Sequence, residues 1–335
     1  MEAFRPQPSG RFFSATHEEI RRGLVADIYF VKTMAALEAG GLKDTPVMAE
    51  IFASRPGYLA GVEEVLHLLE GRPVEVWSLD EGEPFEAKEV VMRLKGPYGA
   101  FGIHETAILG ILASSSAWLT AAREVKTAAG DTPVICFGSR HIHPAVAPVM
   151  ERAALLAGLD GASNILGAKL FGKEPQGTIP HAFILIVGDT VEAARLYDRA
   201  LPPEEPRTIL VDTFKDEAEE ALRVAAALGE RLAGVRLDTP SERGGVTPEL
   251  VREVRARLDQ AGFRHVKIFV SGGVTPEKIP LLKAAGADGF GVGSYISRAA
   301  PIDMTMDLKE IDGRPVAKRG RIPGATPTER LKKKR

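Results

Sequence analysis

Short apolar segments, each ending in glycine or in a polar side chain, recur through the second half of this chain and constrain its fold more than any other feature. Amphipathic segments with apolar residues at three- and four-residue spacing lie between most of them, as at residues 145–158, 215–232 and 247–262. Thr247 followed by Pro248 is typical of a helix N-terminus. Short buried strands that alternate with helices predict parallel βαβ units. The strand candidates are residues 133–138, 161–165, 177–180, 207–212, 234–238, 267–273 and 289–293.

The number of these strands decides between a closed and an open barrel. Only about six of them are clear, fewer than the eight of a closed β/α barrel. We therefore expect an α/β fold with an irregular, incomplete β/α barrel over residues 131–300, although a closed barrel is not excluded at this point. In such a barrel the carboxyl ends of the strands build the active site. The polar residues that follow the strands should accordingly lie together.

Residues 1–130 have a different pattern, which predicts a separate α+β sheet domain and a linking helix. Alternation and Gly-Pro turns favour strands, and two stretches have helical spacing. The strand candidates are residues 46–54, 73–79 and 89–96, and the helix candidates are residues 58–71 and 104–130.

The last segment, residues 301–335, has no place in a barrel. Asp312-Gly313 lies between two strand-like runs and predicts a β-hairpin over residues 304–321. We expect this hairpin to return to the N-terminal sheet, which makes that domain discontinuous. The sequence ERLKKKR at residues 329–335 is interpreted as a solvated basic tail.

Composition excludes several classes of protein. The formal net charge of the 335-residue chain is −2, which argues against nucleic acid and anionic membranes as partners. No apolar run approaches the ~20 residues that span a bilayer, and the N-terminus lacks a secretory pattern. The single Cys136 excludes an intrachain disulfide framework and fits a cytoplasmic protein. One Asn and three Gln indicate either a thermophilic source or a GC-rich genome.

Two glycine turns after neighbouring strands predict an anion site. Ser271-Gly272-Gly273 and Gly291-Val292-Gly293-Ser294 each precede a helix pattern. Free backbone N–H groups and a helix N-terminus bind phosphate, and turns after the last two strands of a barrel form the usual phosphate corner. Plain tight turns are the alternative.

Acidic and basic side chains also follow the strands. Asp212 and Asp238 would bind ribose hydroxyls or organise Mg²⁺, or would cap helices instead. Arg140 and Arg236 would bind a ligand carboxylate or phosphate, because a buried unpaired charge is costly. An internal salt bridge to one of the two aspartates is the alternative for these arginines.

Three histidines complete the set of candidates. His181 stands between a polar turn and the apolar run 182–187, where it is either a core histidine or a titratable group at a pocket. His141 and His143 form an H-x-H pair, which also occurs in metal-dependent barrel hydrolases. That hydrolase is a rival interpretation, although the adjacent arginine and proline disfavour a metal there.

Several of these segments together resemble the nicotinate phosphoribosyltransferases, which are type II phosphoribosyltransferases. The segment 26–33 resembles the family's T-D-x-Y motif with Ala26 in place of threonine, and residues 105–113 resemble its E-T helix. FGSRH at residues 137–141 matches the F-G-[ST]-R turn, and residues 162–182 match the long run that ends in G-T-x-x-H. The motifs VDTF, VRLD, SGG and GFGVGS follow in order.

The resemblance implies transfer of phosphoribose from phosphoribosyl pyrophosphate to nicotinate, giving nicotinate mononucleotide and pyrophosphate. It implies Mg²⁺ carried by phosphoribosyl pyrophosphate near Asp212 and Asp238, and ATP as an optional co-substrate that phosphorylates His181. Tyr29 would stack on the pyridine ring, reaching the site of a partner subunit in a homodimer or larger assembly. Arg140 would hold the nicotinate carboxylate, with Arg236 beside the ring. The further substrate-binding residues would be His141, Thr178, Ser271, Gly272, Gly273, Gly291, Gly293 and Ser294.

Departures from the family keep alternatives open. The chain is short for the ATP-dependent members, which leaves ATP coupling open, and without a C-terminal cysteine cluster we expect no zinc module. Quinolinate phosphoribosyltransferase shares the architecture, but its two substrate carboxylates call for a larger Arg/Lys cluster, and the motif around His181 argues against it. A pyridine-nucleotide sensor on the same scaffold is the non-enzymatic alternative.

Overall fold

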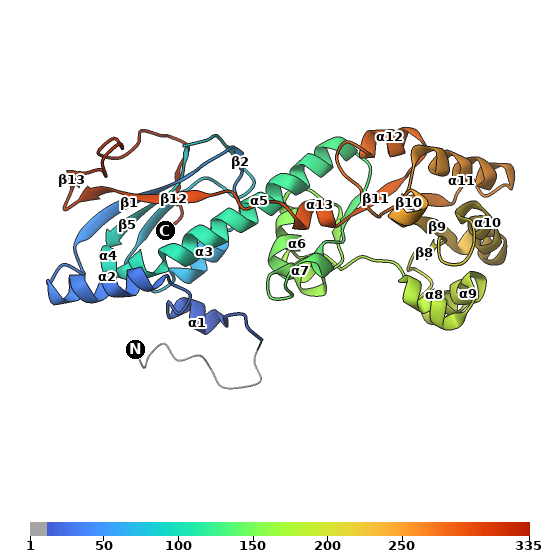
Figure 1. The fold of residues 1–335 in the computed structure, drawn as a ribbon, viewed down its shortest axis with the longest axis horizontal. Coiled ribbons are helices and arrows are strands. Elements are labelled where there is room, and N and C mark those ends of the chain that lie inside the picture. Colours follow the sequence, from blue (N-terminus) through green and yellow to red (C-terminus); the bar gives the residue numbers. More distant parts are fainter. Residues whose placement is uncertain (1–11) are drawn as a thin grey trace. The chain divides into compact units, whose positions relative to one another are not determined.

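A computed structural model describes residues 12–335, which divide into two compact units (Figure 1). One unit combines the N-terminal part of the chain, up to Thr120, with Ala300–Arg335, and the other comprises Ala121–Ala299. The division falls inside helix α5 (Glu105–Ala129), earlier than the domain end expected at residue 130. Residues 1–11, which form most of the N-terminus examined for a secretory pattern, lie outside the described residues. No helix within residues 12–335 is long and apolar enough to cross a membrane.

The first unit contains an antiparallel sheet with the strand order β13-β12-β1-β5-β3-β14. Its strands are β1 (Pro46–Ala53), β3 (Glu75–Ser78), β5 (Val90–Pro97), β12 (Met304–Ile311), β13 (Arg314–Pro315) and β14 (Lys332–Lys333). A short ribbon pairs β2 (Gly57–Tyr58) with β4 (Pro84–Phe85). The helices are α1 (His17–Arg21), α2 (Ile28–Ala39), α3 (Val62–Leu68), α4 (Tyr98–Phe101) and the first part of α5. Figure 1 shows α3 and α5 running along one face of this sheet.

The C-terminal segment returns to this sheet, as the sequence predicts. β12 pairs with β1, and Asp312 and Gly313 turn the chain into β13 with φ values of 48° and 72°. The predicted solvated tail is wrong, because β14 pairs with β3 and forms the edge of the sheet. Lys332 and Lys334 form ion pairs with Asp80, and Lys333 pairs with Glu75. Acidic side chains on and beside β3 thus bind a segment whose charges alone suggest solvent.

The second unit is built on a parallel sheet with the strand order β7-β6-β11-β10-β9-β8. Its strands are β6 (Val134–Cys136), β7 (Gly161–Ala162), β8 (Arg207–Leu210), β9 (Leu232–Leu237), β10 (Lys267–Val270) and β11 (Gly289–Val292). β7 and β8 are the two edges and do not pair with each other, so the sheet is a curled half-barrel. The irregular, incomplete barrel is therefore confirmed, while residues 177–180 form no strand.

Helices cover this sheet in the alternation that the sequence predicts. They are α6 (Ala147–Leu156), α7 (Ile165–Leu170), α8 (His181–Val187), α9 (Thr190–Ala200), α10 (Glu217–Leu228), α11 (Pro248–Gln260), α12 (Ile279–Ala284) and α13 (Ser294–Ser297). Thr247 caps α11 by accepting a hydrogen bond from the Leu250 amide, and Pro248 is the first helical residue. Val235, Ile268 and Phe290 are fully buried in the sheet. Because parallel strands are covered on both faces, such continuous apolar runs are expected.

Candidate active site

A cavity of ≈ 590 Å³ opens at the carboxyl ends of the strands in the second unit. It gathers residues from seven separate stretches of chain, because parallel strands all end at the same edge of the sheet. The residues of the sequence prediction that line it are Arg140, His141, Thr178, His181, Arg236, Asp238, Ser271, Gly272, Gly273, Gly291, Gly293 and Ser294. Asp212 lies behind the cavity wall, next to His181.

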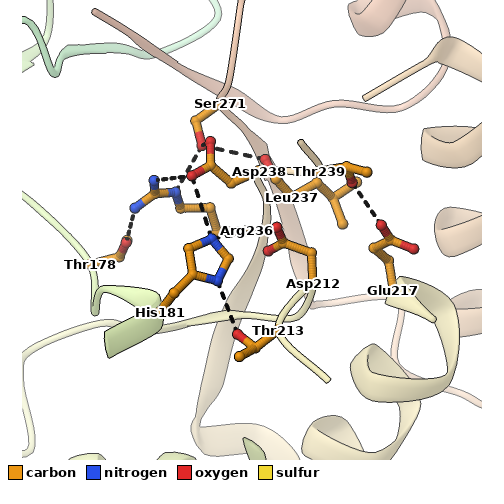
Figure 2. Close-up of polar contacts among 10 residues, drawn as sticks. All are labelled: Thr178, His181, Asp212, Thr213, Glu217, Arg236, Leu237, Asp238, Thr239 and Ser271. Carbon is orange, nitrogen blue, oxygen red and sulfur yellow. Dashed lines mark hydrogen bonds and ion pairs between the residues drawn. The ribbon is translucent and has the colours of Figure 1, made fainter. Parts of the chain in front are cut away.

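His181 is held between polar neighbours (Figure 2). Its Nδ1 atom lies 3.0 Å from the hydroxyl of Thr213. Its Nε2 atom lies 3.5 Å from a carboxylate oxygen of Asp212 and 3.7 Å from one of Asp238. The side chain is 38% exposed, so the alternative of a core histidine is excluded. The ring therefore lies within ion-pair distance of both aspartates and also lines the cavity.

The backbone around His181 differs from the expected strand end. His181 is the first residue of α8, which ends at Gly188 with φ 90°. The apolar run after it is not buried as expected, because Leu185 is 57% exposed and Ile186 is 85% exposed. Ile184 is the buried member of this run. Helix α8 therefore exposes an apolar face.

Asp212 is a buried carboxyl group without a hydrogen-bond partner among the described residues. Its side chain is 1% exposed, and both oxygens lack a donor. Burial raises its pKa to about 6, and Asp238 adds to the rise while His181 opposes it. A buried unsatisfied acceptor costs about 1–3 kcal/mol. Such a group is expected where a ligand supplies the missing partner.

Arg236 binds protein groups with most of its guanidinium (Figure 2). It donates to Ser271 Oγ at 2.8 Å, to Thr178 Oγ1 at 2.7 Å and to Asp238 Oδ2 at 3.0 Å. Ser271 in turn donates to the other oxygen of Asp238 at 2.8 Å. The internal salt bridge that the sequence left as an alternative is therefore present for Arg236. This network fixes Asp238 and the loop of Thr178 in the cavity wall.

Arg140, by contrast, has no ion pair or hydrogen bond within the described part of the chain, although it lines the cavity. It lies in the 3₁₀ turn Ser139–His141 directly after β6. Burial, followed by the charges of Arg140 and Arg298, lowers the pKa of the neighbouring His141. This wall is consequently cationic and has no anion of its own to neutralise Arg140. It is the natural place for a ligand carboxylate.

The H-x-H pair does not act as a unit. His143 accepts a hydrogen bond from the Ala145 amide at 3.1 Å through its own ring nitrogen, whereas His141 lines the cavity. No group of three His, Cys, Asp or Glu side chains suited to a metal is present within residues 12–335. The hydrolase interpretation therefore gains no support from the structure.

The two glycine turns require glycine for different reasons. Gly272 has φ +81°, and a Cβ atom there would lie 2.9 Å from Asp238 Oδ1. A Cβ atom on Gly293 would lie 2.7 Å from the carbonyl oxygen of Phe137. Both turns line the cavity, and they leave it wide enough for a ligand to approach the backbone. This arrangement suits a phosphate group.

Some cavity residues were missed at the sequence level. Phe137 lines the cavity with its ring 5.2 Å from the guanidinium carbon of Arg236, and Ser139 and Ser163 also line it. Glu151 is fully buried on α6 and accepts hydrogen bonds from the loops of both serines. An acid within the apolar face of a predicted helix was the available signal for Glu151.

Tyr29 lies in the first unit, on α2, and is 57% exposed. It borders a separate cavity of ≈ 290 Å³ together with Asp27, Glu105 and Thr106. Burial raises the pKa of Glu105 to about 7, and Asp307 adds to this rise. The role of Tyr29 on a pyridine ring therefore stays a prediction.

Comparison with known proteins gives the family. Residues 27–116 match the model of the quinolinate phosphoribosyl transferase N-terminal domain, and residues 119–307 match that of its C-terminal domain. The crystal structure of a nicotinate-nucleotide pyrophosphorylase from Pyrococcus furiosus is 45% identical, with a TM-score of 0.90, over 94% of this chain and 82% of that chain.

Curated relatives carry two kinds of name. A nicotinate phosphoribosyltransferase of Mycobacterium tuberculosis is 30% identical over 89% of this chain and 74% of its own length. A probable carboxylating nicotinate-nucleotide pyrophosphorylase of Methanothermobacter thermautotrophicus is 24% identical over 87% of this chain and 98% of its own length.

The fold, the cavity and these relatives define a phosphoribosyltransferase of NAD biosynthesis. Within that class, the chain belongs to the quinolinate phosphoribosyl transferase family. The sequence prediction of nicotinate as the substrate is thereby overturned, because both domain models and the 45% identical structure favour the alternative. The motif around His181 was weighted too heavily. It forms a turn that lines the cavity, and such a turn does not by itself indicate which base binds.

Proposed function

We propose that this enzyme transfers the phosphoribosyl group of phosphoribosyl pyrophosphate to quinolinate, giving nicotinate mononucleotide, pyrophosphate and CO₂. The observation that carries the proposal is the match of both units to quinolinate phosphoribosyl transferase domains. The name nicotinate-nucleotide pyrophosphorylase describes cleavage of a nicotinate nucleotide by pyrophosphate, which is a phosphoribosyl transfer written in reverse. The word carboxylating in the archaeal relative's name states that CO₂ is involved in the reaction of that protein.

The proposed chemistry is a displacement followed by loss of CO₂. The pyridine nitrogen forms a bond to C1 of the ribose, and the C1–oxygen bond breaks with its electron pair leaving on pyrophosphate. The carboxylate beside the ring nitrogen then departs as CO₂. Its bonding electron pair stays on the ring carbon, which takes up a proton. The positive charge on the ring nitrogen stabilises that carbanion.

Charges at the cavity fit this sequence of steps. The carboxylates of Asp212 and Asp238 approach each other around His181 Nε2 and would stabilise positive charge that develops at C1. The two glycine turns would bind the 5′-phosphate through backbone N–H groups. Arg140, which lacks a protein partner among the described residues, would receive a carboxylate of quinolinate.

A substrate with two carboxylates needs more than one cation, which was the earlier argument against quinolinate. The charge of Arg298, like that of Arg140, lowers the pKa of His141, so both guanidinium groups act on the same region of the second unit. Arg236 is a second guanidinium in the cavity wall beside that of Arg140, although it is bound to Asp238, and Arg298 lies outside the lining residues. We propose that Arg140, His141 and Arg298 together receive the two carboxylates.

We also propose that the reaction needs Mg²⁺ carried by phosphoribosyl pyrophosphate. The two unsatisfied oxygens of Asp212 fit such an ion, because oxygen ligands are those that Mg²⁺ prefers. Bound there, the ion would neutralise charge on the departing pyrophosphate. Asp212 and Asp238 would hold it jointly with the substrate.

ATP has no part in this proposal, because loss of CO₂ already makes the transfer irreversible. Nε2 of His181 also lies near the two carboxylates, which would repel a phosphoryl group on that atom. Incubation with γ-labelled ATP should therefore leave no acid-labile label on the protein. A label that disappears in His181→Ala would show ATP coupling after all.

We further propose that the enzyme is a homo-oligomer. Apolar side chains are exposed on α7 and α8, and the most exposed are Ile165, Leu166, Leu170, Leu185 and Ile186. A second copy of the chain would cover them, and Tyr29 would then reach the partner's cavity. Light scattering should give at least a dimer, and Ile186→Glu should dissociate it. A monodisperse monomer would contradict the proposal.

A direct test of the substrate compares quinolinate, nicotinate and nicotinamide with phosphoribosyl pyrophosphate and Mg²⁺. Quinolinate labelled in the carboxylate beside the nitrogen should release one labelled CO₂ for each pyrophosphate, with or without ATP. Turnover of nicotinate alone would reject quinolinate as the substrate. The absence of pyrophosphate release with every base would reject the enzyme function and favour the sensor.

A further inference from the structure

Glu151 on α6 is a fully buried carboxylate that binds two different loops of the cavity. One oxygen accepts from the amide of Ser139 at 3.2 Å, from its hydroxyl at 2.7 Å and from the hydroxyl of Ser163 at 3.1 Å. The other accepts from the amide of Asn164 at 2.6 Å. Four donors therefore converge on one side chain that has no contact with solvent.

Both loops carry residues that line the cavity. Ser139 begins the turn that holds Arg140 and His141, and it lines the cavity itself. Ser163 also lines the cavity, and the next residue, Asn164, caps α7 by accepting from the Gly167 amide. Glu151 thus connects the loop after β6 to the loop after β7 from behind the cavity wall.

The same contacts fix the direction of two hydrogen bonds. A carboxylate can only accept, so the hydroxyl protons of Ser139 and Ser163 must both point to Glu151. Each serine oxygen then presents only lone pairs to the cavity. A ligand carboxylate gains nothing from these two oxygens, whereas a ligand hydroxyl can donate to them.

We propose that Glu151 is a positioning residue for the pyridine carboxylate site. It holds the backbone of the turn so that Arg140 receives the carboxylate, and it keeps Ser139 and Ser163 as acceptors for hydroxyl groups of the sugar. The inference rests on the proposed function only in taking the cavity as the site of a pyridine carboxylate. Its effect should appear in substrate binding and not merely in stability.

The test compares Glu151→Gln with a matched control, Glu220→Gln. Glu220 is also fully buried in this unit, on α10, where it pairs with Arg223 and does not line the cavity. In Glu151→Gln an amide NH₂ must face at least one of the four donors, which displaces a loop. Displacement of a positioning group by about 1 Å can cost about a hundred-fold. We expect the KM for quinolinate to rise about ten-fold or more with a smaller fall in kcat, and Glu220→Gln to leave the KM unchanged.

A double-mutant cycle with Ser139→Ala sharpens the test. Groups that act as one network are non-additive, so Ser139→Ala should raise the KM less in the Glu151→Gln background than in the wild type. Additive effects, or a Glu151→Gln KM equal to that of the wild type, would overturn the proposal. If Glu151→Gln does not fold, the Ser139→Ala/Ser163→Ala enzyme replaces it, and an unchanged KM there overturns the proposal as well.

The outcome separates this inference from the proposed function. If the wild type uses nicotinate instead of quinolinate, the proposed substrate fails, and the same variants are compared on nicotinate. If no base is turned over, calorimetric binding of quinolinate in the presence of phosphoribosyl pyrophosphate gives the comparison. Equal affinity in the wild type and Glu151→Gln would then reject the positioning role.

Discussion

Glu50 in the antiparallel sheet and Asp212 beside the half-barrel cavity are both carboxyl groups with a side-chain exposure of 1%, yet their surroundings are opposite. Glu50 accepts two hydrogen bonds from Arg93, at 3.0 and 2.6 Å, and two from Thr326, at 3.0 and 2.6 Å. Asp212 accepts none from a described residue. Glu50 is thus a satisfied buried carboxylate, and Asp212 is an unsatisfied one.

This difference distinguishes a structural charge from a functional one. A buried carboxylate with four donors stabilises the fold and is costly to alter. A buried carboxyl group without donors lowers stability, and it persists where binding a ligand compensates. Arg140 differs from Asp212 in being exposed, but it also lines the cavity without a described partner. Substitutions in the two units should therefore have opposite effects on stability and activity.

The largest effect is expected for Asp212→Asn. Loss of a preorganised charge in an active site typically costs about 10²–10³ in kcat. Because the pKa of Asp212 is raised to about 6, the folded state binds its proton more tightly than the unfolded state. The wild type therefore loses stability as pH rises from about 4 to about 6, and the variant does not. We expect Asp212→Asn to be more stable at pH 8 by about 1–3 kcal/mol.

Urea unfolding of both proteins from pH 4 to pH 8, with kcat at pH 8, measures these effects. A variant that is less stable at pH 8 and retains full kcat would show that Asp212 is an ordinary buried residue.

The opposite behaviour is expected for Glu50→Gln. Gln cannot replace the carboxylate that Arg93 and Thr326 share, so the free energy of unfolding should fall by about 2–4 kcal/mol. The activity of each folded molecule should be unchanged, because Glu50 lies in the other unit from the cavity. Urea unfolding and active-site titration provide the measurement. A loss of kcat without a loss of stability would remove the distinction between the two carboxylates.

Arg140→Ala should affect binding alone. A charge-assisted hydrogen bond is worth about 1.5–3 kcal/mol, so the KM for quinolinate should rise about ten- to hundred-fold. The melting temperature should stay the same, since no described protein group loses a partner. Arg195→Ala is a suitable control, because Arg195 pairs only with Glu192 on the surface of α9. A lower melting temperature with an unchanged KM would make Arg140 structural.

The smallest effect is expected in the first unit, for the double variant Lys332→Ala/Lys334→Ala. The two ammonium groups hold the pKa of Asp80 down at about 2. Their contribution to stability is present above about pH 4 and is lost as pH falls through 2. Exposed ion pairs contribute little, so the melting temperature should fall slightly at pH 7 and less at pH 3. Differential scanning calorimetry at both pH values tests this, and a variant that differs more at pH 3 would contradict it.

Much of the fold follows from local patterns. Period-two and helical spacing placed β1, β5 and α5, and the Asp312-Gly313 turn gave the hairpin, because these features depend on neighbouring residues. The glycine turns after β10 and β11 indicated the cavity for the same reason. Contacts between distant segments could not be predicted in this way. Thr326 and Glu50 are 276 residues apart, and the ordered tail depends on Asp80.

Prediction of the candidate active site was limited in the same way, because local patterns do not reveal contacts between distant segments. Polar residues at strand ends identified Asp212, Asp238 and Arg140, since parallel strands end at one edge, and the turn before an apolar run identified His181. Their patterns did not reveal that Arg236 would be bound and Arg140 free within the described chain. Nor did they reveal that α8 would expose its apolar run, because helical spacing does not say what lies opposite a helix.

The sequence by itself determined the alternation of strands and helices, the return of the C-terminus and most of the polar residues at the cavity. Those features depend on short-range sterics and on the burial of apolar side chains. Only the tertiary structure decided which of the buried charges are satisfied. Desolvation and hydrogen bonding depend on what surrounds a group in three dimensions. Glu50 and Glu151 therefore accept four hydrogen bonds each, whereas the buried Asp212 accepts none from the described residues.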